Sequence, residues 1–483
     1  MSEIGDFGVV VLAVSATVYV ALLGMRLADR LSLPYAALFL VAAAIISDLW
    51  SELATVLSIG DVERIAVVAL ILILFDGGLH IGAARFRRSI GPIFALGVVG
   101  TFVTAGVVAL AARYLLGFSW IESGLVGAAL APTDPAVTVS VYGKREIRGR
   151  SGTIQEGEAG VNDPVGIALM IGMIELAGEE HGSFWVVVQE FVVEMALGLA
   201  VGLVGAWILL PVFRRVELTG LALYPIRLLA GAGILYGLAA ALGGSGFLAV
   251  FVAGILLGDA AMPRKGEIES FHSSLAGLAE IAVFIGLGLT ISLSELDSIG
   301  IWADGIAIAL VLALVARPLA VLPLLLPARL TMRERLFIVW GGLKGAVPIL
   351  LGALAVMAAV EGATDLYGIV FIVVVFSVVV QGTSLPYVAR RLRIPFRRVD
   401  HDLAEIMEFV VGENASARGR AIGDLPLGER AWVGVLVRDG RPRPIDGGVV
   451  LEAGDRVHVY AQSEDMAALE RIFSGTTGFS ARA

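Results

Sequence analysis

The sequence contains no cysteine and few charged residues, and both absences narrow the class of protein. Without cysteine, disulfide bonds and thiolate metal sites are excluded. Charged residues make up 16% of the 483 positions, whereas soluble proteins have about 25%. Hydrophobic residues make up 58%, which is more than a soluble core absorbs. We therefore expect a polytopic membrane protein.

Other signals are also missing. The N-terminal stretch "MSEIGDF" has no basic residue before its apolar run, so we do not expect a cleaved signal peptide. No run of filter residues such as TVGYG occurs, which argues against a potassium channel. The net charge is −9, and nothing in the sequence indicates a nucleic-acid partner, a cofactor or an enzymatic site.

Thirteen apolar runs are long enough to cross a bilayer as helices. They lie near residues 8–24, 31–49, 62–80, 90–115, 119–141, 153–176, 185–212, 219–241, 244–259, 270–293, 302–326, 335–359 and 364–389. Glycine is abundant, at 59 residues, as close helix packing in lipid requires. We expect residues 1–395 to form an all-α transmembrane domain of about 13 spans.

The loops between these runs alternate in charge. Connections from odd to even spans and the segment after the last span are basic, with Arg26, Arg30, Arg85, Arg87, Arg88, Lys144, Arg145, Arg148, Arg150, Arg214, Arg215, Arg264, Lys265, Arg329, Arg333 and Arg335. Connections from even to odd spans are acidic, with Asp48, Glu52, Asp61, Glu179, Glu180, Glu295, Asp297, Asp304, Glu361 and Asp365. Arg64 and Arg113 are the exceptions. The positive-inside rule predicts an N-terminus outside and a C-terminus in the cytoplasm.

The tail beyond residue 400 has a different pattern. "WVGVLVRDGRPRP" alternates in polarity and leads into an Asp439-Gly440 hairpin signal. "GGVVLEAGDRVHVYA" predicts two more short strands, around Gly454-Asp455. "SEDMAALERIFSG" begins with a serine cap and has helical apolar spacing. We expect residues 402–474 to form a small cytoplasmic α+β domain, which lacks a glycine-rich nucleotide fingerprint and which we interpret as regulatory.

Eight polar residues inside the predicted spans are the candidates for intramembrane groups: Asp76, Asp134, Glu158, Asn162, Asp163, Glu280, Arg317 and Lys344. An ionisable group inside a bilayer is costly, so each is a candidate functional residue. The alternative for any one of them is an interfacial position or a neutral packing pair. Two interrupted helices make that alternative less attractive for the set as a whole.

The first interruption is "APTDPAVT" in span five, where Pro132 and Pro135 flank Thr133 and Asp134. Each proline removes an amide donor and forces the preceding residue out of helical geometry. In lipid, such backbone persists only where it is buried in protein or lines a polar cavity. The freed carbonyls and Asp134 offer hard oxygen ligands that suit alkali cations. A plain proline kink, the alternative, does not need Asp134.

The second interruption is "GGLKGAVPI" in span twelve, where Lys344 lies among Gly342, Gly345 and Pro348. With span seven as a linker, spans 1–6 and 8–13 form two halves that are inverted in the membrane. The interrupted span is the fifth in each half, and paired broken helices in inverted repeats indicate a transporter's midplane site. We expect Lys344 to neutralise the facing half-helix C-termini; the alternative is an interfacial lysine.

Span six contains "EGEAGVNDPVGIALM", and its acids have separate expected roles. Glu156 lies near the cytoplasmic end, where water reaches it. Arg317, inside span eleven, nearly always keeps its proton and needs a carboxylate partner when buried; Glu158 is our candidate. Asp163 is then left unpaired. A buried, unpaired carboxylate binds either a proton or a metal cation, and this competition is sufficient for 1:1 exchange.

Five stretches together resemble the monovalent cation:proton antiporters of the NhaP/NHE type (the CPA1 family). They are "FDGGL" at 75–79, "PTDP" at 132–135, "EGEAGVNDP" at 156–164, "GGSGFLAVFVAG" at 243–254 and "GLKGAVP" at 342–348. The resemblance covers residues 1 to about 395. It implies an inverted-repeat fold with a core domain and a dimerisation domain, and electroneutral exchange of K⁺ or Na⁺ for H⁺.

The same resemblance implies roles for individual residues. Asp163, beside Asn162, would be the shared proton and cation carboxylate, and the cation would also be held near Thr133 and Asp134 with Asp76 nearby. It implies a Glu158–Arg317 ion pair as well. Three positions depart from the family pattern: Ala159 stands where serine is frequent, Lys344 where arginine is usual, and Glu280 where glutamine is common.

The tail resembles the C-terminal subdomain of RCK/TrkA regulators of potassium transport, on "DLPLGERAWVGVLVRDG" and "LEAGDRVHVYA". Antiporters with this attachment are similar to the CvrA group of potassium/proton antiporters. Such subdomains usually dimerise and bind small anionic ligands, so Arg418 and Arg420 in "GENASARGR" are candidate ligand contacts. The alternative is a solvated loop.

Three functions remain open from the sequence. A K⁺/H⁺ antiporter of the cytoplasmic membrane, acting as a homodimer, is favoured by the tail, and a Na⁺/H⁺ antiporter fits the same ligands. A regulated potassium channel is the rival from another class, and a non-transporting sensor is the third.

Overall fold

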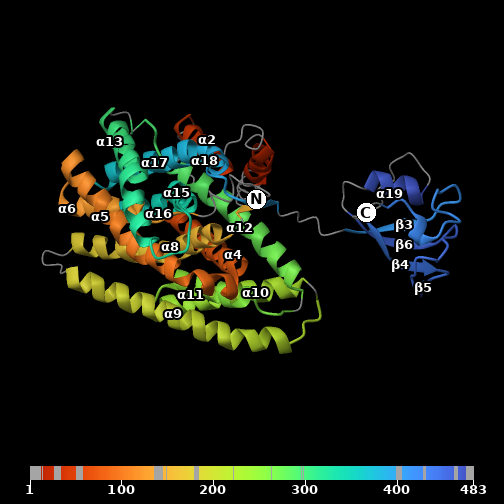
Figure 1. Ribbon diagram of the computed structural model, residues 1–483. Helices are drawn as coiled ribbons and strands as arrows, with labels where there is room; N and C mark the ends of the chain where they lie inside the picture. Colours follow the sequence, from red (N-terminus) through yellow and green to blue (C-terminus); the bar gives the residue numbers. More distant parts are fainter. Residues whose placement is uncertain are drawn as a thin grey trace, which may run out of the picture. The chain divides into compact units, whose positions relative to one another are not determined.

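The computed structural model describes residue 12 and residues 15–26, 34–49, 58–134, 145–147, 149–178, 184–220, 222–262, 264–294, 296, 299–398, 405–427, 431–461 and 466–474. The chain separates into two compact units, Met1–Arg397 and Arg398–Ala483. Figure 1 shows that the first unit is a bundle of helices and the second a small sheet with one helix.

Within the described residues, the first unit consists of helices and their connections. One short strand pair, β1 (Arg145–Ile147) with β2 (Phe396–Arg398), reaches the boundary between the units. Its α-helices are α2 (Tyr35–Leu49), α4 (Ile59–Phe94), α5 (Thr101–Ala111), α6 (Trp120–Leu130), α8 (Arg150–Gly178), α9 (Phe184–Arg215), α10 (Leu223–Ala241), α11 (Gly246–Gly258), α12 (Lys265–Leu289), α13 (Ile299–Val311), α14 (Arg317–Leu324), α15 (Met332–Trp340), α16 (Ala346–Met357), α17 (Ala363–Phe376) and α18 (Thr383–Leu392). Short π-helical turns join several of them: η1 (Ala95–Gly100), η2 (Ala112–Leu116), η3 (Leu312–Ala316) and η4 (Ser377–Gly382).

Seven helical segments within the described residues are long and apolar enough to cross a membrane, and four further apolar helices are shorter. The prediction of a mostly helical membrane protein is thereby confirmed. The count of thirteen spans stays a prediction, since several predicted spans correspond to helices that are shorter or joined to a neighbour. Predicted span five, for example, contains α6, which ends at Leu130.

Spans three and four, predicted as separate, lie in one continuous helical run, Ile59–Leu116. A straight helix of that length would be about 87 Å long, far beyond the roughly 30 Å of a bilayer core. The run leaves helical geometry at Gly82, whose φ is 67° and ψ 156°. The Asp259 carboxylate lies against this glycine and accepts a hydrogen bond from the Ala84 amide. Gly82 thus supplies the break that the basic loop predicted near Arg85.

Glycines allow α4 and α11 to pack with their backbones in contact. A Cβ at Gly254 would lie 2.6 Å from the Phe75 carbonyl oxygen, and one at Gly78 would lie 2.6 Å from that of Phe251. Neither position has room for a side chain. Small residues at helix contacts are how membrane helices pack without a hydrophobic driving force between them.

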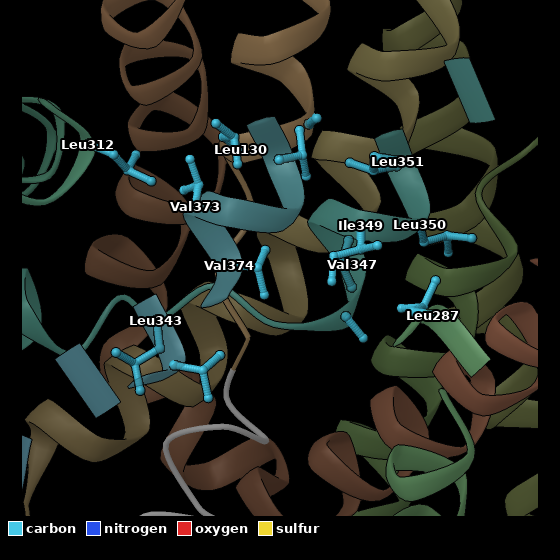
Figure 2. Packing of buried hydrophobic residues seen from close by; sticks show 14 of the residues in the cluster. Leu130, Leu287, Leu312, Leu343, Val347, Ile349, Leu350, Leu351, Val373 and Val374 are labelled. Carbon is cyan, nitrogen blue, oxygen red and sulfur yellow. The ribbon is translucent and has the colours of Figure 1, made fainter. Parts of the chain in front are cut away.

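Apolar side chains of α16 form the centre of the largest core cluster. Figure 2 shows Val347, Ile349, Leu350 and Leu351 surrounded by residues of other helices, including Leu130 at the end of α6 and Leu287 on α12. The outer surface is apolar too: Trp207 on α9 is 76% exposed. An exposed apolar surface of this kind is expected where helices face lipid.

The second unit is an antiparallel sheet in the order β3-β6-β4-β5 with helix α19 (Met466–Phe473). Its strands are β3 (Glu405–Val410), β4 (Trp432–Arg438), β5 (Arg441–Arg443) and β6 (Arg456–Ala461). The predicted hairpin is present, because β4 pairs with β5 across Asp439 and Gly440, which both have positive φ. Val457, Val459 and Phe473 are fully buried in its core.

The number of strands predicted for this unit was too high by one. The "GGVVLEAGDRVHVYA" stretch forms a single strand, β6, and its first half makes only an isolated bridge between Val450 and Ala421. Arg438 explains the irregular first half, because its guanidinium bonds the Val450 carbonyl and the carboxylates of Glu452 and Asp455. The serine predicted to cap α19 lies outside the described residues.

Candidate functional site

The two predicted interruptions lie side by side in the first unit. α6 ends at Leu130, and Pro132–Asp134 are not helical. α15 ends at Trp340, and the chain becomes helical again only at Ala346. The Asp134 amide donates to the Leu343 carbonyl (2.9 Å), and the Ala346 amide donates to Asp134 Oδ2 (3.1 Å). Pro135, the second predicted helix breaker, lies outside the described residues.

The helices that lead into the two breaks begin alike. Ser119 caps α6 and Thr331 caps α15, and each is paired with a glutamate three residues later, Glu122 and Glu334, in a capping box. These caps satisfy the first free amides, so both short helices are well defined at the end remote from the break.

Lys344 lies inside the second break and binds the backbone just after the end of α6. Its side chain is fully buried, and Nζ donates to the carbonyls of Ala131 (2.9 Å) and Pro132 (2.6 Å). A cation at a helix C-terminus complements the carbonyl dipoles there. The sequence had predicted free carbonyls at this break as cation ligands; those of Ala131 and Pro132 are occupied by the ammonium group instead.

Gly345 must be a glycine because Asp134 takes the space beside it. A Cβ at position 345 would lie 1.9 Å from Asp134 Oδ2. Ser377 of η4 completes the support, since its hydroxyl accepts a hydrogen bond from the Lys344 amide (2.8 Å). The second break is thus held by Asp134 on one side and by Ser377 on the other.

Asn162 connects α8 to the first break. Its Nδ2 donates to Thr133 Oγ1 (2.8 Å), and its Oδ1 accepts from the Thr133 amide (3.3 Å). Both side chains are buried. Asn162 therefore replaces part of the backbone bonding that α6 loses where it ends, and it fixes the orientation of the Thr133 hydroxyl.

Asp163, the next residue of α8, is buried without such partners. Its side chain is 2% exposed, and Oδ1 has no hydrogen-bond partner among the described residues. The charged groups that act on it are Asp134 and Lys344. Ala159, one turn earlier, is also buried and brings no oxygen to this face. A buried carboxylate that lacks donors is costly as an isolated anion.

Glu158, by contrast, has a cationic partner. Arg317 at the start of α14 donates from Nη1 to Glu158 Oε1 (2.6 Å) and from Nη2 to Oε2 (3.5 Å). Nη2 also donates to the Ile338 carbonyl of α15 (3.3 Å). Both side chains are at most 3% exposed. Gly342 packs on the guanidinium, where a Cβ would lie 2.3 Å from Nε.

Asp76, expected near the cation, has one partner on α12 and one on its own helix, α4. Its Oδ1 accepts from Ser273 Oγ on α12 (3.1 Å) and lies 3.3 Å from His80 Nδ1 on α4. The structure thus gives Asp76 a place in the contact between α4 and α12. A role in holding the cation stays a prediction.

Glu280 on α12 is a further buried acid. It is 6% exposed, and Oε2 accepts a hydrogen bond from the Tyr35 hydroxyl at the start of α2 (2.6 Å). Oε1 has no partner among the described residues.

Sequence reasoning missed the polar residues that support these groups. Ser377 and Tyr35 each stand among apolar residues in the sequence, and their hydroxyls bond the Lys344 amide and Glu280, respectively. A single neutral polar residue in a membrane helix is a weak signal. Only its partner, distant in the sequence, shows its role.

In the second unit, the candidate ligand contacts Arg418 and Arg420 are exposed. Arg418 Nη1 donates to the Glu413 carbonyl (2.8 Å), which closes the loop on itself. These arginines do not contribute to the buried core of the sheet.

The comparisons with known proteins agree with this division of the chain. A family model described as the transmembrane sodium/hydrogen exchanger matches residues 16–391, and a TrkA-C domain model matches residues 406–474.

Several named relatives are antiporters. The K(+)/H(+) antiporter NhaP2 of Shewanella sp. (strain MR-4) is 32% identical over 426 residues, which cover 84% of this chain and 73% of the relative. The K(+)/H(+) antiporter NhaP of Alkalimonas amylolytica is 31% identical over 426 residues, covering 85% and 74%. The Na(+)/H(+) antiporter NhaH of Halobacillus aidingensis is 27% identical over 351 residues, covering 69% and 84%.

Among solved structures, the sodium proton antiporter MjNhaP1 from Methanocaldococcus jannaschii at pH 8 superposes with a TM-score of 0.67 at 24% identity. The match covers 79% of this chain and 99% of that structure, and it establishes a shared fold. Together with the family match, it shows that the chain belongs to the sodium/hydrogen exchanger family and is a multi-pass transmembrane cation/proton antiporter, not an enzyme, with a TrkA-C domain at its C-terminal end.

Proposed function

We propose that this antiporter exchanges K⁺ for H⁺ across the cytoplasmic membrane, one for one, by competition at Asp163. The observation that carries the proposal is the unpartnered Oδ1 of this buried carboxylate. A proton or a bound cation neutralises the carboxylate, and either removes the penalty of a bare buried charge. Because only one of them fits at a time, each cation bound releases one proton, and no net charge moves per cycle.

The neighbouring groups supply a fixed background of charge. The Glu158–Arg317 pair is neutral as a unit, and Lys344 is held on the C-terminal end of α6. Asn162 precedes Asp163 on α8 and fixes the Thr133 hydroxyl, so both residues offer oxygens for a cation, and Asp134 adds a negative charge. In this set, the carboxylate of Asp163 is the group that can exchange a bound proton for a bound cation.

We further propose that two inverted repeats carry the two broken helices, with the N-terminus outside and the C-terminus in the cytoplasm. The support is the alternation of loop charge and the matching position of the two breaks. Because the chain contains no cysteine, single cysteines placed at Arg87 and at Asp365 report the two sides directly. A membrane-impermeant thiol reagent applied to whole cells is expected to label position 365 and to spare position 87. The reverse pattern would overturn the orientation.

The choice of K⁺ over Na⁺ rests on similarity. Two relatives with about 31–32% identity are named K(+)/H(+) antiporters, and the TrkA-C tail resembles regulators of potassium transport. Na⁺ is the second candidate, because NhaH and MjNhaP1 are named as sodium/proton antiporters. The ligand atoms do not separate the two ions, since carboxylate and hydroxyl oxygens suit both.

Everted membrane vesicles test this function. An acid interior is established by respiration, and KCl or NaCl is then added while the internal pH is followed. We expect KCl to dissipate the pH gradient at lower concentration than NaCl does. Dissipation by NaCl alone would favour the second candidate. Flux that requires an added counter-ion path would indicate a channel, and no flux would indicate a sensor.

For the C-terminal unit we propose a regulatory role in a homodimer, with a small anionic ligand at Arg418 and Arg420. The support is their exposure on a loop closed by the Arg418–Glu413 contact. Replacing both arginines by glutamine should change the cation concentration needed for half-maximal exchange while the maximal rate stays the same. An unchanged concentration would favour the solvated loop.

A further inference from the structure

Glu280 is the buried acid that exchange at Asp163 does not use. It lies on α12, seven residues and therefore two helical turns after Ser273. Ser273 binds Asp76 of α4, whereas Glu280 binds Tyr35 of α2. Both side chains project into helix contacts of the transmembrane unit.

The partners of Glu280 do not compensate a negative charge. Oε2 has one neutral donor, the Tyr35 hydroxyl, and Oε1 has no partner within the described residues. The buried cations of this unit are engaged elsewhere: Arg317 binds Glu158, and Lys344 binds two carbonyls of the first break. A carboxyl that is 6% exposed and has one neutral donor is stable as the neutral acid.

The ionisable groups around Glu280 determine how easily its carboxyl group loses a proton. The ionisable neighbours that act on it are Asp134 of the first break and Tyr35. Of the helices packed against α12, α4 carries Asp76, which is held by Ser273 and His80. The titratable residues of α10 are Tyr224, Arg227 and Tyr236, and α16 has none. Asp134 therefore acts electrostatically on both Glu280 and Asp163.

We propose that Glu280 is a second proton-binding site, whose proton competes with the transported cation through the charge at the helix breaks. A cation bound among Asp163 and Asp134 adds positive charge near Glu280 and makes its ionised form less costly. Binding of the cation therefore also releases a proton from Glu280. This proton returns to the side from which it came and is not carried across, so the exchange at Asp163 stays one for one. Tyr35 is the positioning residue, because its hydroxyl stabilises the ionised carboxylate.

This proposal rests on the proposed exchange at Asp163, and its signature is the pH dependence of cation affinity. Each proton released on binding changes the half-saturating cation concentration by up to about tenfold per pH unit. Asp163 alone gives a slope of at most one decade per pH unit. With Glu280, the slope exceeds one decade where both groups titrate.

The test measures initial exchange in proteoliposomes of the full chain, with KCl as the cation, at a series of pH values. Glu280→Gln is a close isostere of the neutral acid. We expect wild type to exceed one decade per pH unit and Glu280→Gln to stay at or below one decade, with its affinity falling behind wild type as pH rises. Glu267→Gln, an exposed change on the same helix, is the control and should match wild type. Equal slopes for Glu280→Gln and wild type would overturn the proposal.

Tyr35→Phe is an independent test of the proposal, and it can be used even if the Glu280→Gln protein does not fold. It removes the one donor to Glu280 that the described residues supply, so the ionised form is less stable and the steep part of the slope should move to higher pH. A Tyr35→Phe profile that coincides with wild type would contradict the proposal. Failure of the proposed function can be distinguished from failure of the Glu280 proposal, because in the first case wild type itself shows no K⁺-driven proton flux.

Discussion

The two units of the chain each bury a carboxylate against an arginine. Among the residues that the structure describes, the transmembrane unit also buries acids that lack a cationic partner. In the C-terminal unit, Asp455 is 1% exposed and accepts from both Nε and Nη2 of Arg438 (2.8 and 2.7 Å). In the transmembrane unit, Glu158 has Arg317, but Asp163 and Glu280 each keep one oxygen without a partner in the described residues.

This difference separates structural acids from functional ones. A paired buried acid is difficult to change, because either partner alone would be an uncompensated charge. An unpaired acid is costly until it takes up a proton or a cation, so its occupancy responds to the solution on either side of the membrane.

The largest effect should come from the unpaired acid of α8. Asp163→Asn removes the carboxylate that binds the proton or the cation, and it leaves the volume of the side chain nearly the same. We expect exchange to fall to the background of vesicles without the protein, while yield and gel-filtration behaviour stay unchanged. Asp365→Asn, an exposed change at the start of α17, is the matched control. Exchange that survives in the Asp163→Asn protein would remove Asp163 from the site.

Breaking the pair on the same helix should act on folding instead. Arg317→Ala leaves Glu158 buried and unpaired, which costs about 3–5 kcal/mol. The expected result is a large loss of folded protein in detergent, measured by gel filtration and thermal unfolding. Adding Glu158→Gln to Arg317→Ala should recover part of the yield. If Arg317→Ala kept its yield and lost exchange, the pair would have a transport role.

The corresponding pair in the C-terminal unit should have a smaller and local effect. Arg438→Ala removes charge-assisted hydrogen bonds worth about 1.5–3 kcal/mol each, and it leaves Asp455 buried. Hydrogen exchange followed by mass spectrometry should show lower protection of β6 and of the loop before it. Protection of α8 and α16 should not change, and a change there would show that the two units are not independent.

The smallest effect is the response of the C-terminal unit to acid. Burial alone would raise the pKa of Asp455, but hydrogen bonds from Arg438 and the Glu452 amide, with the charge of Arg438, hold that pKa below its ordinary value. The stabilisation is fully present above the unfolded pKa of about 3.9. It is lost as pH falls through the lower folded pKa. Pepsin cleavage within β6 should therefore increase below pH 4 in wild type, and Asp455→Asn should show weaker pH dependence.

The sequence located the two helix breaks and one ion pair better than it located the ends of the helices, and the transport roles of these residues stay predictions. Prolines and glycines inside apolar runs located both breaks, since few other residues disrupt a helix so reliably. The pairing of Glu158 with Arg317 followed from the permanent charge of arginine. Lys344 was expected at a half-helix C-terminus, and the structure places its ammonium on the Ala131 and Pro132 carbonyls.

Contacts between distant neutral residues were not predictable. Nothing in the sequence connects Tyr35 to Glu280 or Ser377 to Lys344, because one polar atom in an apolar helix has no periodicity. The continuous run through α4 was missed because the basic loop and the positive φ of Gly82 fall close together, and only backbone geometry distinguishes a kink from a loop.

Exchange at Asp163 requires that this carboxyl give up a proton when a cation binds. Purified protein in weakly buffered detergent solution, titrated with KCl while a dye follows pH, measures that proton. Wild type is expected to release protons in proportion to the protein present, and Asp163→Asn to release none. Undiminished release from the Asp163→Asn protein would contradict the assignment of exchange to this carboxylate.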